Sequence, residues 1–182
     1  MKPWQHLKTI CHHRRLVRQG CFRVGLYWQG LTHDLSKFSP TEFWSGAKYF
    51  QGNRSPNSAQ REAEGYSVAW MHHKGRNRHH YEYWTDILPG TGKYGPVPMP
   101  RKYLAEMVMD RRAACMTYEG KNYTPASPLA YFSRSKERHF MHPQTARELE
   151  FLLSMLKEKG EKETFSFIRS TVLTGKTFAE EN

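Results

Sequence analysis

The spacing of apolar side chains near the start of the chain restricts the folds that it can adopt. Ile10, His13, Val17, Cys21 and Val24 recur at intervals of three and four residues, which places them on one face of an α-helix. His13 lies inside this apolar stripe, where a histidine is commonly a hydrogen-bonded core residue. No alternating run elsewhere is long enough to predict a strand. We therefore expect an all-α fold.

Capping residues, prolines and glycines mark the boundaries of the other helices. The segment "SPTE" at Ser39–Glu42 combines a capping box with a proline in the first turn, and it opens a helix that should run to about Phe50. The glycine- and proline-rich stretch Leu88–Pro100 predicts an ordered loop and not a strand, and we expect the tail from Thr174 to fray. Other helices are expected over about 4–24, 31–37, 59–73, 101–118, 142–160 and 161–173, with a short one at "HHYEYW". Together they predict a bundle of six to eight helices.

Composition limits the domain count, the compartment and the partners. A chain of 182 residues that is 38% hydrophobic suits one domain over 1–182, with core motifs between 13 and 110 and C-terminal helices over 128–175. Three cysteines, an odd number in helical segments, argue for a reducing compartment. No signal-peptide pattern and no run of roughly 18 apolar residues is present, so we expect a cytoplasmic protein without a membrane partner. The formal charge of +11 favours phosphate-bearing partners such as nucleotides or nucleic acid.

Histidines cluster in a way that composition alone does not explain. Four of the ten histidines lie in "MHHKGRNRHH" at 71–80, as two pairs around a basic turn. Imidazole and carboxylate groups bind Zn, Fe, Mn and related ions when several converge from different elements. The run can also be a basic surface loop, and Glu106 and Asp110 can be a solvated helix edge. The candidate ligands are His13, His33, Asp34, one histidine of each pair, and Asp110.

Three separated blocks resemble a known family. The blocks "HDLSKFSPTEF", "AWMHHKGRNRHHYEYW" and "MPRKYLAEMVMD" resemble DUF5662, a family of bacterial and phage proteins without an established activity, over about 13–110. The order His, His-Asp, His, His, Asp also resembles the HD-domain superfamily of metal-dependent phosphohydrolases and its di-iron oxygenase relatives, and "HDLSK" is similar to their HD-x-x-K form. The resemblance implies an HD-like helical bundle that holds one or two divalent transition-metal ions, which would be Fe, Mn, Zn, Co or Ni.

The resemblance also implies a role for each candidate ligand. Asp34 would bridge two ions and Asp110 would close the site. His73 stands four residues before Asn77, as in the family pattern H-x-x-x-N-x-H-H, but the choice between the members of each histidine pair stays open, and His80 can replace His79. The implied metal ligands are His13, His33, Asp34, His73, His79 and Asp110.

Such a centre predicts chemistry on a phosphate ester. Two metal ions polarise a phosphoryl oxygen and lower the pKa of bound water from 15.7 to about 7. Lys37, one helical turn beyond Asp34, would neutralise a phosphate oxygen, although it can instead pair with Glu42. His80 or Glu106 would donate a proton to the leaving group. The residues expected to bind substrate phosphate are Lys37, Lys74, Arg76 and Arg78. The substrate would be a phosphorylated small molecule or a nucleotide.

Two other classes of function remain as alternatives. A di-iron oxygenase would use the same six ligands, and the identity of the metal would separate the two enzymes. A basic nucleic-acid-binding module is favoured by the charge and by Trp70, Tyr81, Tyr83 and Trp84, although packing in the core is the preferred interpretation of these aromatic residues. Such a module would lose affinity steeply as salt rises and would not respond to a chelator. We rank the phosphohydrolase first because the positive charge suits a phosphorylated substrate.

Overall fold

The fold is helical apart from one short hairpin. The computed structural model describes residues 1–135 and 137–179. Strands β1 (Thr85–Ile87) and β2 (Tyr94–Pro96) pair antiparallel, with Asp86 opposite Gly95. The α-helices are α1 (Pro3–Arg23), α2 (Tyr27–Thr32), α3 (Pro40–Tyr49), α4 (Pro56–Glu64), α5 (Val68–Lys74), α6 (Arg101–Glu119), α7 (Ser127–Arg134) and α8 (Pro143–Phe167). The all-α prediction is confirmed, with eight helices in the described part of the chain.

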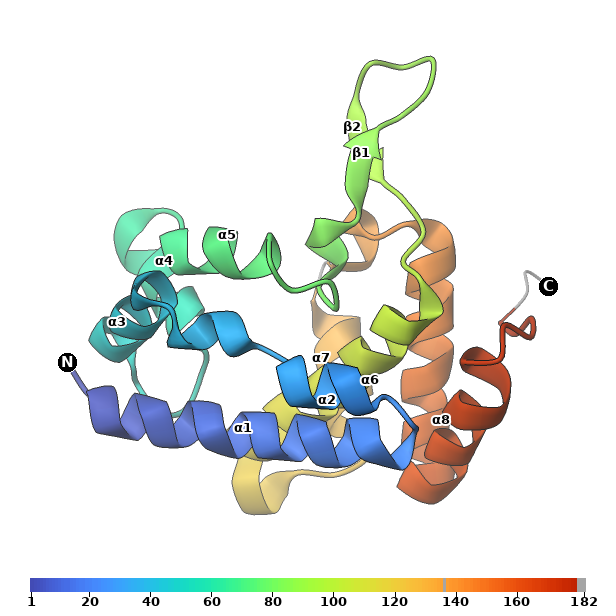
Figure 1. Cartoon of the computed structure of the whole chain (residues 1–182), viewed down its shortest axis with the longest axis horizontal. Helices are drawn as coiled ribbons and strands as arrows, with labels where there is room; N and C mark the ends of the chain where they lie inside the picture. Colours follow the sequence, from blue (N-terminus) through green and yellow to red (C-terminus); the bar gives the residue numbers. More distant parts are fainter. Residues whose placement is uncertain (136, 180–182) are drawn as a thin grey trace.

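Two long helices organise the rest of the molecule (Figure 1). α1 packs against α6, α3 lies against the N-terminal end of α1, and α4 and α5 pack against α3. α7 and α8 pack against α6 at the other end of the fold, and the β1–β2 hairpin projects away from the body. Among the described residues, no helix combines the length and apolar character that crossing a bilayer requires.

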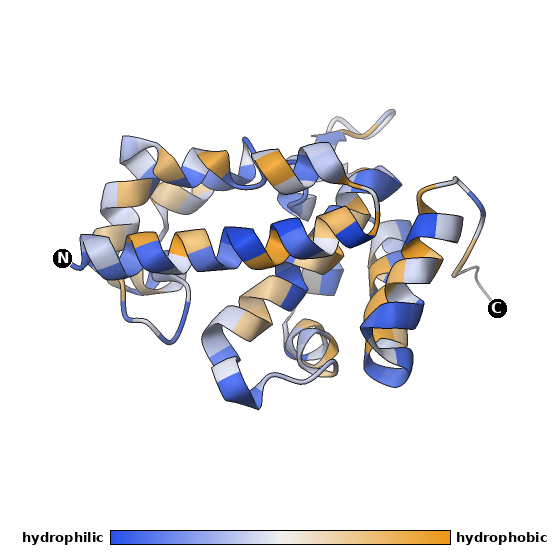
Figure 2. Ribbon diagram, turned by 60° about the horizontal axis from the view of Figure 1, so that its bottom comes forward, coloured by the Kyte–Doolittle hydropathy of each residue, from blue (hydrophilic) through white to orange (hydrophobic). Residues whose placement is uncertain are grey.

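A continuous apolar core joins α1, α6 and α8. Val17, Cys21, Leu104, Val108 and Leu152 all have no exposed surface, so Cys21 is the small buried apolar residue that its position in the stripe predicts. Figure 2 shows hydrophilic and hydrophobic residues alternating along α1. The helix is therefore amphipathic, as the spacing of its apolar residues predicts.

Several predicted boundaries are confirmed. Ser39 caps α3, because its Oγ accepts a hydrogen bond from the backbone N–H of Glu42 at 3.4 Å. His142 caps α8 by accepting from the N–H of Gln144 at 3.3 Å. Gly160 interrupts α8 where a break between two helices is expected, with a φ of 74° that glycine adopts at little cost.

Other predicted elements are wrong. The single helix expected over 59–73 is two helices, since Gly65 ends α4 with a φ of 81° and Ser67 caps α5. The loop expected over 88–100 contains β2, and the turn at Gly90 and Gly92 brings this strand back alongside β1. The described part of the tail does not fray, because Phe178 is buried against Phe151 and Phe167; residues 180–182 lie outside the described chain.

Candidate metal centre

A tight turn places His33 and Asp34 side by side, facing the same space. The helix predicted over 31–37 is wrong: α2 ends at Thr32 and a separate 3₁₀ turn begins at Leu35. Asp34 lies between them in the left-handed region, with φ 53° and ψ 29°, a conformation that aspartate tolerates better than most residues. Arg14 of α1 holds the turn, because its guanidinium donates to the carbonyl oxygens of His33 at 2.8 Å and Leu31 at 3.1 Å.

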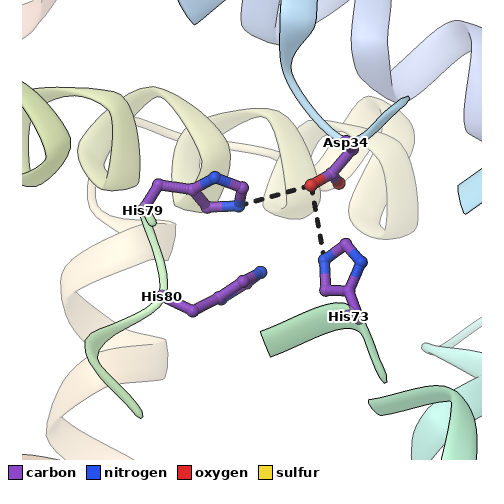
Figure 3. A group of neighbouring side chains, drawn as sticks. All are labelled: Asp34, His73, His79 and His80. Carbon is purple, nitrogen blue, oxygen red and sulfur yellow. Dashed lines mark ion pairs between the residues drawn. The ribbon is translucent and has the colours of Figure 1, made fainter. Parts of the chain in front are cut away.

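The predicted ligands converge from α1, the His33–Asp34 turn, the α5 region and α6. His13 Nε2 lies 2.9 Å from Asp110 Oδ1, and His33 Nε2 lies 3.4 Å from the same oxygen. On the other side, His73 Nε2 and His79 Nε2 lie 3.3 Å and 3.4 Å from Asp34 Oδ1. Figure 3 shows His73, His79 and His80 pointing toward Asp34 from two chain segments. The sequence-predicted ligands therefore share one buried location.

The cluster divides into two groups that have only Asp34 in common. Asp34 Oδ2 faces His33 and His13, at 3.4 Å and 4.0 Å from their Nε2 atoms, whereas Oδ1 faces the histidines of the α5 region. Each group offers ligand atoms that all lie within 4.8 Å of one another. The first group is His13, His33, Asp34 and Asp110, and the second is Asp34, His73, His79 and His80.

Unpartnered polar atoms in the cluster fit a metal ion. Four buried atoms have no hydrogen-bond partner in the described chain: Asp34 Oδ1 and the Nε2 atoms of His33, His79 and His80. The other Asp34 oxygen, Oδ2, has the Lys37 ammonium at 2.6 Å. A buried polar atom without a partner is costly, so such atoms are rare. These four atoms are the nitrogen and oxygen donors that a transition-metal ion would bind. These buried groups could therefore hold a metal ion.

Carboxylates behind the rings fix which nitrogen of each imidazole faces the cluster. Glu106 Oε1 accepts hydrogen bonds from His33 Nδ1 at 2.9 Å and His79 Nδ1 at 3.2 Å. Glu42 Oε2 accepts from His73 Nδ1 at 2.7 Å. An ionised carboxylate can only accept, so each of these Nδ1 atoms carries a proton, and Nε2 presents a lone pair toward the cluster when the ring is neutral. His33, His79 and Glu106 also form a third possible metal group, but its Nδ1 atoms are already paired with the carboxylate.

The electrostatics of the cluster call for positive charge. Burial opposes the ionisation of Asp34, but His33, Lys37, His73 and His79 hold its pKa well below the usual range. Burial also lowers the pKa of His33, yet Asp34, Asp110 and Glu106 together raise that pKa to about 10. Burial keeps the pKa of His80 well below its ordinary value, helped by the neighbouring His79. The buried carboxylates therefore favour a positive charge beside them. His80 presents a neutral imidazole, which is the form that binds a metal ion.

The geometry distinguishes the members of two of the three histidine pairs. His73 is buried and faces Asp34, whereas His72, the next residue on the same helix, turns to Glu42 with Nδ1 at 2.6 Å from Oε1. Successive helical residues point about 100° apart, so only one of the two can face the cluster. His13 is buried and His12 is exposed for the same reason. In the last pair both His79 and His80 reach the second group.

A cavity of about 670 Å³ opens beside the cluster. His13, Asp34, His73, His80 and Asp110 of the cluster line this cavity. Cationic and aromatic side chains line the remaining wall, among them Lys37, Arg54, Arg61, Arg111, Trp70, Tyr118 and Tyr131. A ligand of several heavy atoms can therefore reach the cluster.

The residues expected to bind phosphate lie in two different places. Lys37 lines the cavity, and its Nζ lies 2.6 Å from Asp34 Oδ2, so its partner is Asp34 and not Glu42. Lys74, Arg76 and Arg78 are not among the residues that line the cavity. Arg78 instead donates to the Tyr103 hydroxyl at 3.1 Å and lies over the Tyr83 ring. The structure thus brings one of the four expected cations to the cavity.

The expected proton donors take other positions. Glu106 is buried behind His33 and His79 and does not line the cavity. His80 lines the cavity but belongs to the second ligand group. Trp70 packs edge-on against His80, with ring centroids 4.7 Å apart, and also lines the cavity. Tyr81 and Trp84 pack against the apolar core, as the preferred interpretation of these residues predicts.

Sequence reasoning missed two residues that shape the centre. The sequence predicts Glu42 as part of a capping box or as a partner of Lys37, yet its carboxylate binds His72 and His73. Asn77 appears in the sequence only as part of a pattern, and its amide donates to the His73 carbonyl at 2.7 Å and to Ser36 Oγ at 2.8 Å. The Glu42 contacts have no local sequence signal, because Glu42 lies about thirty residues from the histidines that it holds.

A comparison with protein-family models assigns the chain to a family. Residues 2–155 match the model of DUF5662, described as a family of unknown function. The chain belongs to the DUF5662 family. The matched residues include every member of both ligand groups and end within α8. No curated protein and no solved structure matches the chain.

Proposed function

We propose that this DUF5662 protein is a metal-dependent phosphohydrolase of HD type that acts on a phosphorylated small molecule or a nucleotide. The observation that carries the proposal is the position of Asp34, whose two carboxylate oxygens face two different sets of histidines. A carboxylate shared in this way suits a pair of ions, and paired ions are a common means of hydrolysing phosphate esters. The order of the ligands along the chain resembles the HD-type order, which supports the proposal.

The two ligand groups would hold the ions. His13, His33, Asp34 and Asp110 would bind one, and Asp34, His73, His79 and His80 the other. The ions would polarise a phosphoryl oxygen and lower the pKa of a water molecule from 15.7 to about 7. Glu106 and Glu42 act as positioning residues, because their hydrogen bonds orient the imidazoles of His33, His79 and His73.

The cavity supplies the contacts for the rest of the substrate. Lys37 lies beside Asp34 and is the cation best placed to neutralise a phosphate oxygen as charge builds up. Arg61 and Arg111 on the cavity wall would take the anion-binding role expected of Lys74, Arg76 and Arg78, whereas Arg54 on the same wall is paired with Glu62. Trp70 covers the histidine rings on the cavity side and offers an apolar surface to the organic part of a substrate.

Metal content and hydrolysis together test the proposal. Purified protein is expected to contain a transition metal and to release phosphate from one class among phosphomonoesters, phosphodiesters and nucleotides, with the activity abolished by chelator. Iron together with oxygen uptake, without phosphate release, would favour the di-iron oxygenase. Tight binding of nucleic acid that weakens with salt and ignores chelator would favour the binding module.

Substitution of Asp34 gives the sharpest single test. Asp34→Asn should reduce kcat/KM by more than about 100-fold and lower the metal content, because both ligand groups lose their shared anion. Asp86→Asn is the matched control, since Asp86 is an exposed aspartate on the hairpin, and it should retain both metal and activity. Full metal occupancy in Asp34→Asn, or in the double variant His33→Ala with Asp34→Ala, would rule out the proposed centre.

A further inference from the structure

The two ligand groups differ in their chemistry. The group around His73, His79 and His80 offers three imidazoles and one carboxylate (Figure 3). The group around His13 and His33 offers two imidazoles and two carboxylates. Imidazole donors favour ions such as Zn, Cu, Fe and Ni, whereas carboxylate oxygens also suit Mn and Mg. The two positions are therefore not equivalent for any one ion.

Lys37 creates a second difference between the positions. Its ammonium lies 2.6 Å from Asp34 Oδ2, and this oxygen is the one that faces His33 and His13. The other oxygen, Oδ1, faces His73 and His79. A cation in the His13 group would compete with the ammonium for Oδ2, whereas a cation in the His80 group would meet an oxygen that no described lysine or arginine pairs with.

The His80 group also has the better-prepared donors. His79 Nε2 and His80 Nε2 are buried without a hydrogen-bond partner in the described chain. In the His13 group only His33 Nε2 is a histidine nitrogen without such a partner, because His13 Nε2 and Asp110 Oδ1 are bonded to each other at 2.9 Å. Binding an ion in the His13 group would break that bond as well as the Lys37 ion pair. The Lys37 ion pair and the His13–Asp110 bond therefore both favour binding of the first ion in the His80 group.

We propose that the two positions fill in order. An ion in the His80 group binds first and tightly, and an ion in the His13 group binds second and more weakly because it displaces Lys37 from Asp34 Oδ2. The Lys37 side chain is 28% exposed and lines the cavity, so it can turn toward the cavity when the second ion arrives. Lys37 thus becomes available to a phosphate only in the fully loaded centre. The inference rests on the metal centre of the proposed function and assigns its loading order.

Titration of the metal-free protein with Co²⁺ tests the order. Protein dialysed against chelator should show two binding events by calorimetry, the first tighter by about tenfold or more. Lys37→Met should strengthen the second event by roughly tenfold and leave the first unchanged, since only Oδ2 gains a free lone pair. Lys8→Met is the matched control, because it removes the same charge from an exposed position on α1, and both events should stay as in the wild type.

Two ligand variants assign the events to their positions. His80→Gln should weaken the first event, and Asp110→Asn should weaken the second, each by roughly tenfold or more. Circular dichroism and thermal melting identify a variant that fails to fold, and Lys37→Gln then replaces Lys37→Met. Two events of equal affinity, one ion per chain at saturating Co²⁺, or a second event unaffected by either Lys37 variant would overturn the proposal.

The loading order and the phosphohydrolase activity can fail separately. Ordered binding of two ions without hydrolysis of any phosphate ester would refute the activity and keep the order. Hydrolysis by a centre whose two ions bind equally tightly would keep the activity and refute the order. Absence of any metal binding would refute both.

Discussion

The two sides of α6 are buried almost equally but by different means. Leu104 and Val108 have no exposed surface and belong to the apolar core that α1 and α8 complete. Glu106 lies on the same helix with 5% exposure, among the histidines. On the apolar side every buried atom gains from leaving water, at roughly 25 cal/mol per Å². On the polar side, buried charges are a cost unless they are paired.

This difference teaches that burial alone does not separate a stabilising core from a binding site. The two are separated by whether the buried polar atoms have hydrogen-bond partners within the protein. The polar side leaves Asp34 Oδ1 and the Nε2 atoms of three histidines without hydrogen bonds in the described chain. A folded protein that keeps such atoms together has them available for a ligand. Substitutions on the two sides should therefore change different measured quantities.

The largest effect on stability is expected from the apolar side. Leu152→Ala should lower the free energy of unfolding by about 2–5 kcal/mol, because it leaves a cavity at a residue with no exposed surface. Denaturant titration of the metal-free protein measures this loss. The Co²⁺ affinity of the folded fraction should stay unchanged. A matching drop in metal affinity would mean that the two sides of α6 are not independent.

A smaller effect, on metal binding, is expected from the polar side. Glu106→Gln should weaken metal binding by about 10–100-fold, because it removes the carboxylate that orients His33 and His79. The matched control is Glu148→Gln, at a buried glutamate of α8 that pairs with Arg101 at 3.0 Å. Glu148→Gln should lower the melting temperature and leave the metal affinity unaltered. Equal effects of the two substitutions on metal affinity would contradict a positioning role for Glu106.

The smallest effect is expected where a helix end supports the centre. Ser39→Ala removes the cap of α3 and should cost about 1 kcal/mol of stability. For a chain of this size that corresponds to a fall in melting temperature of roughly 2–4 °C, which calorimetry resolves. Glu42 at the same helix end accepts a hydrogen bond from His73, so a modest loss of metal affinity should accompany the loss of stability. Unchanged stability would show that the cap contributes nothing to α3.

Local signals predicted the elements well where they were strong. The apolar stripe of α1, the Ser39 cap and the break at Gly160 are confirmed because each depends on neighbouring residues alone. Gly65 and Ser67 carry the same kind of signal, a helix stop and a cap. Taken together, these two residues predict two helices within 59–73. The turn at Asp34 was missed because aspartate in the left-handed region leaves no mark in the sequence.

The sequence by itself determined a helical protein of the DUF5662 family whose separated histidines and aspartates could bind metal, since residue types and spacings are local facts. Only the tertiary structure decided which imidazole nitrogen faces Asp34, and that Lys37 contacts the oxygen on the His13 side. It also decided that Glu42 and Glu106 lie behind the rings. The physical reason is that these contacts join residues tens of positions apart, and packing of α1, α5 and α6 brings them within hydrogen-bond range.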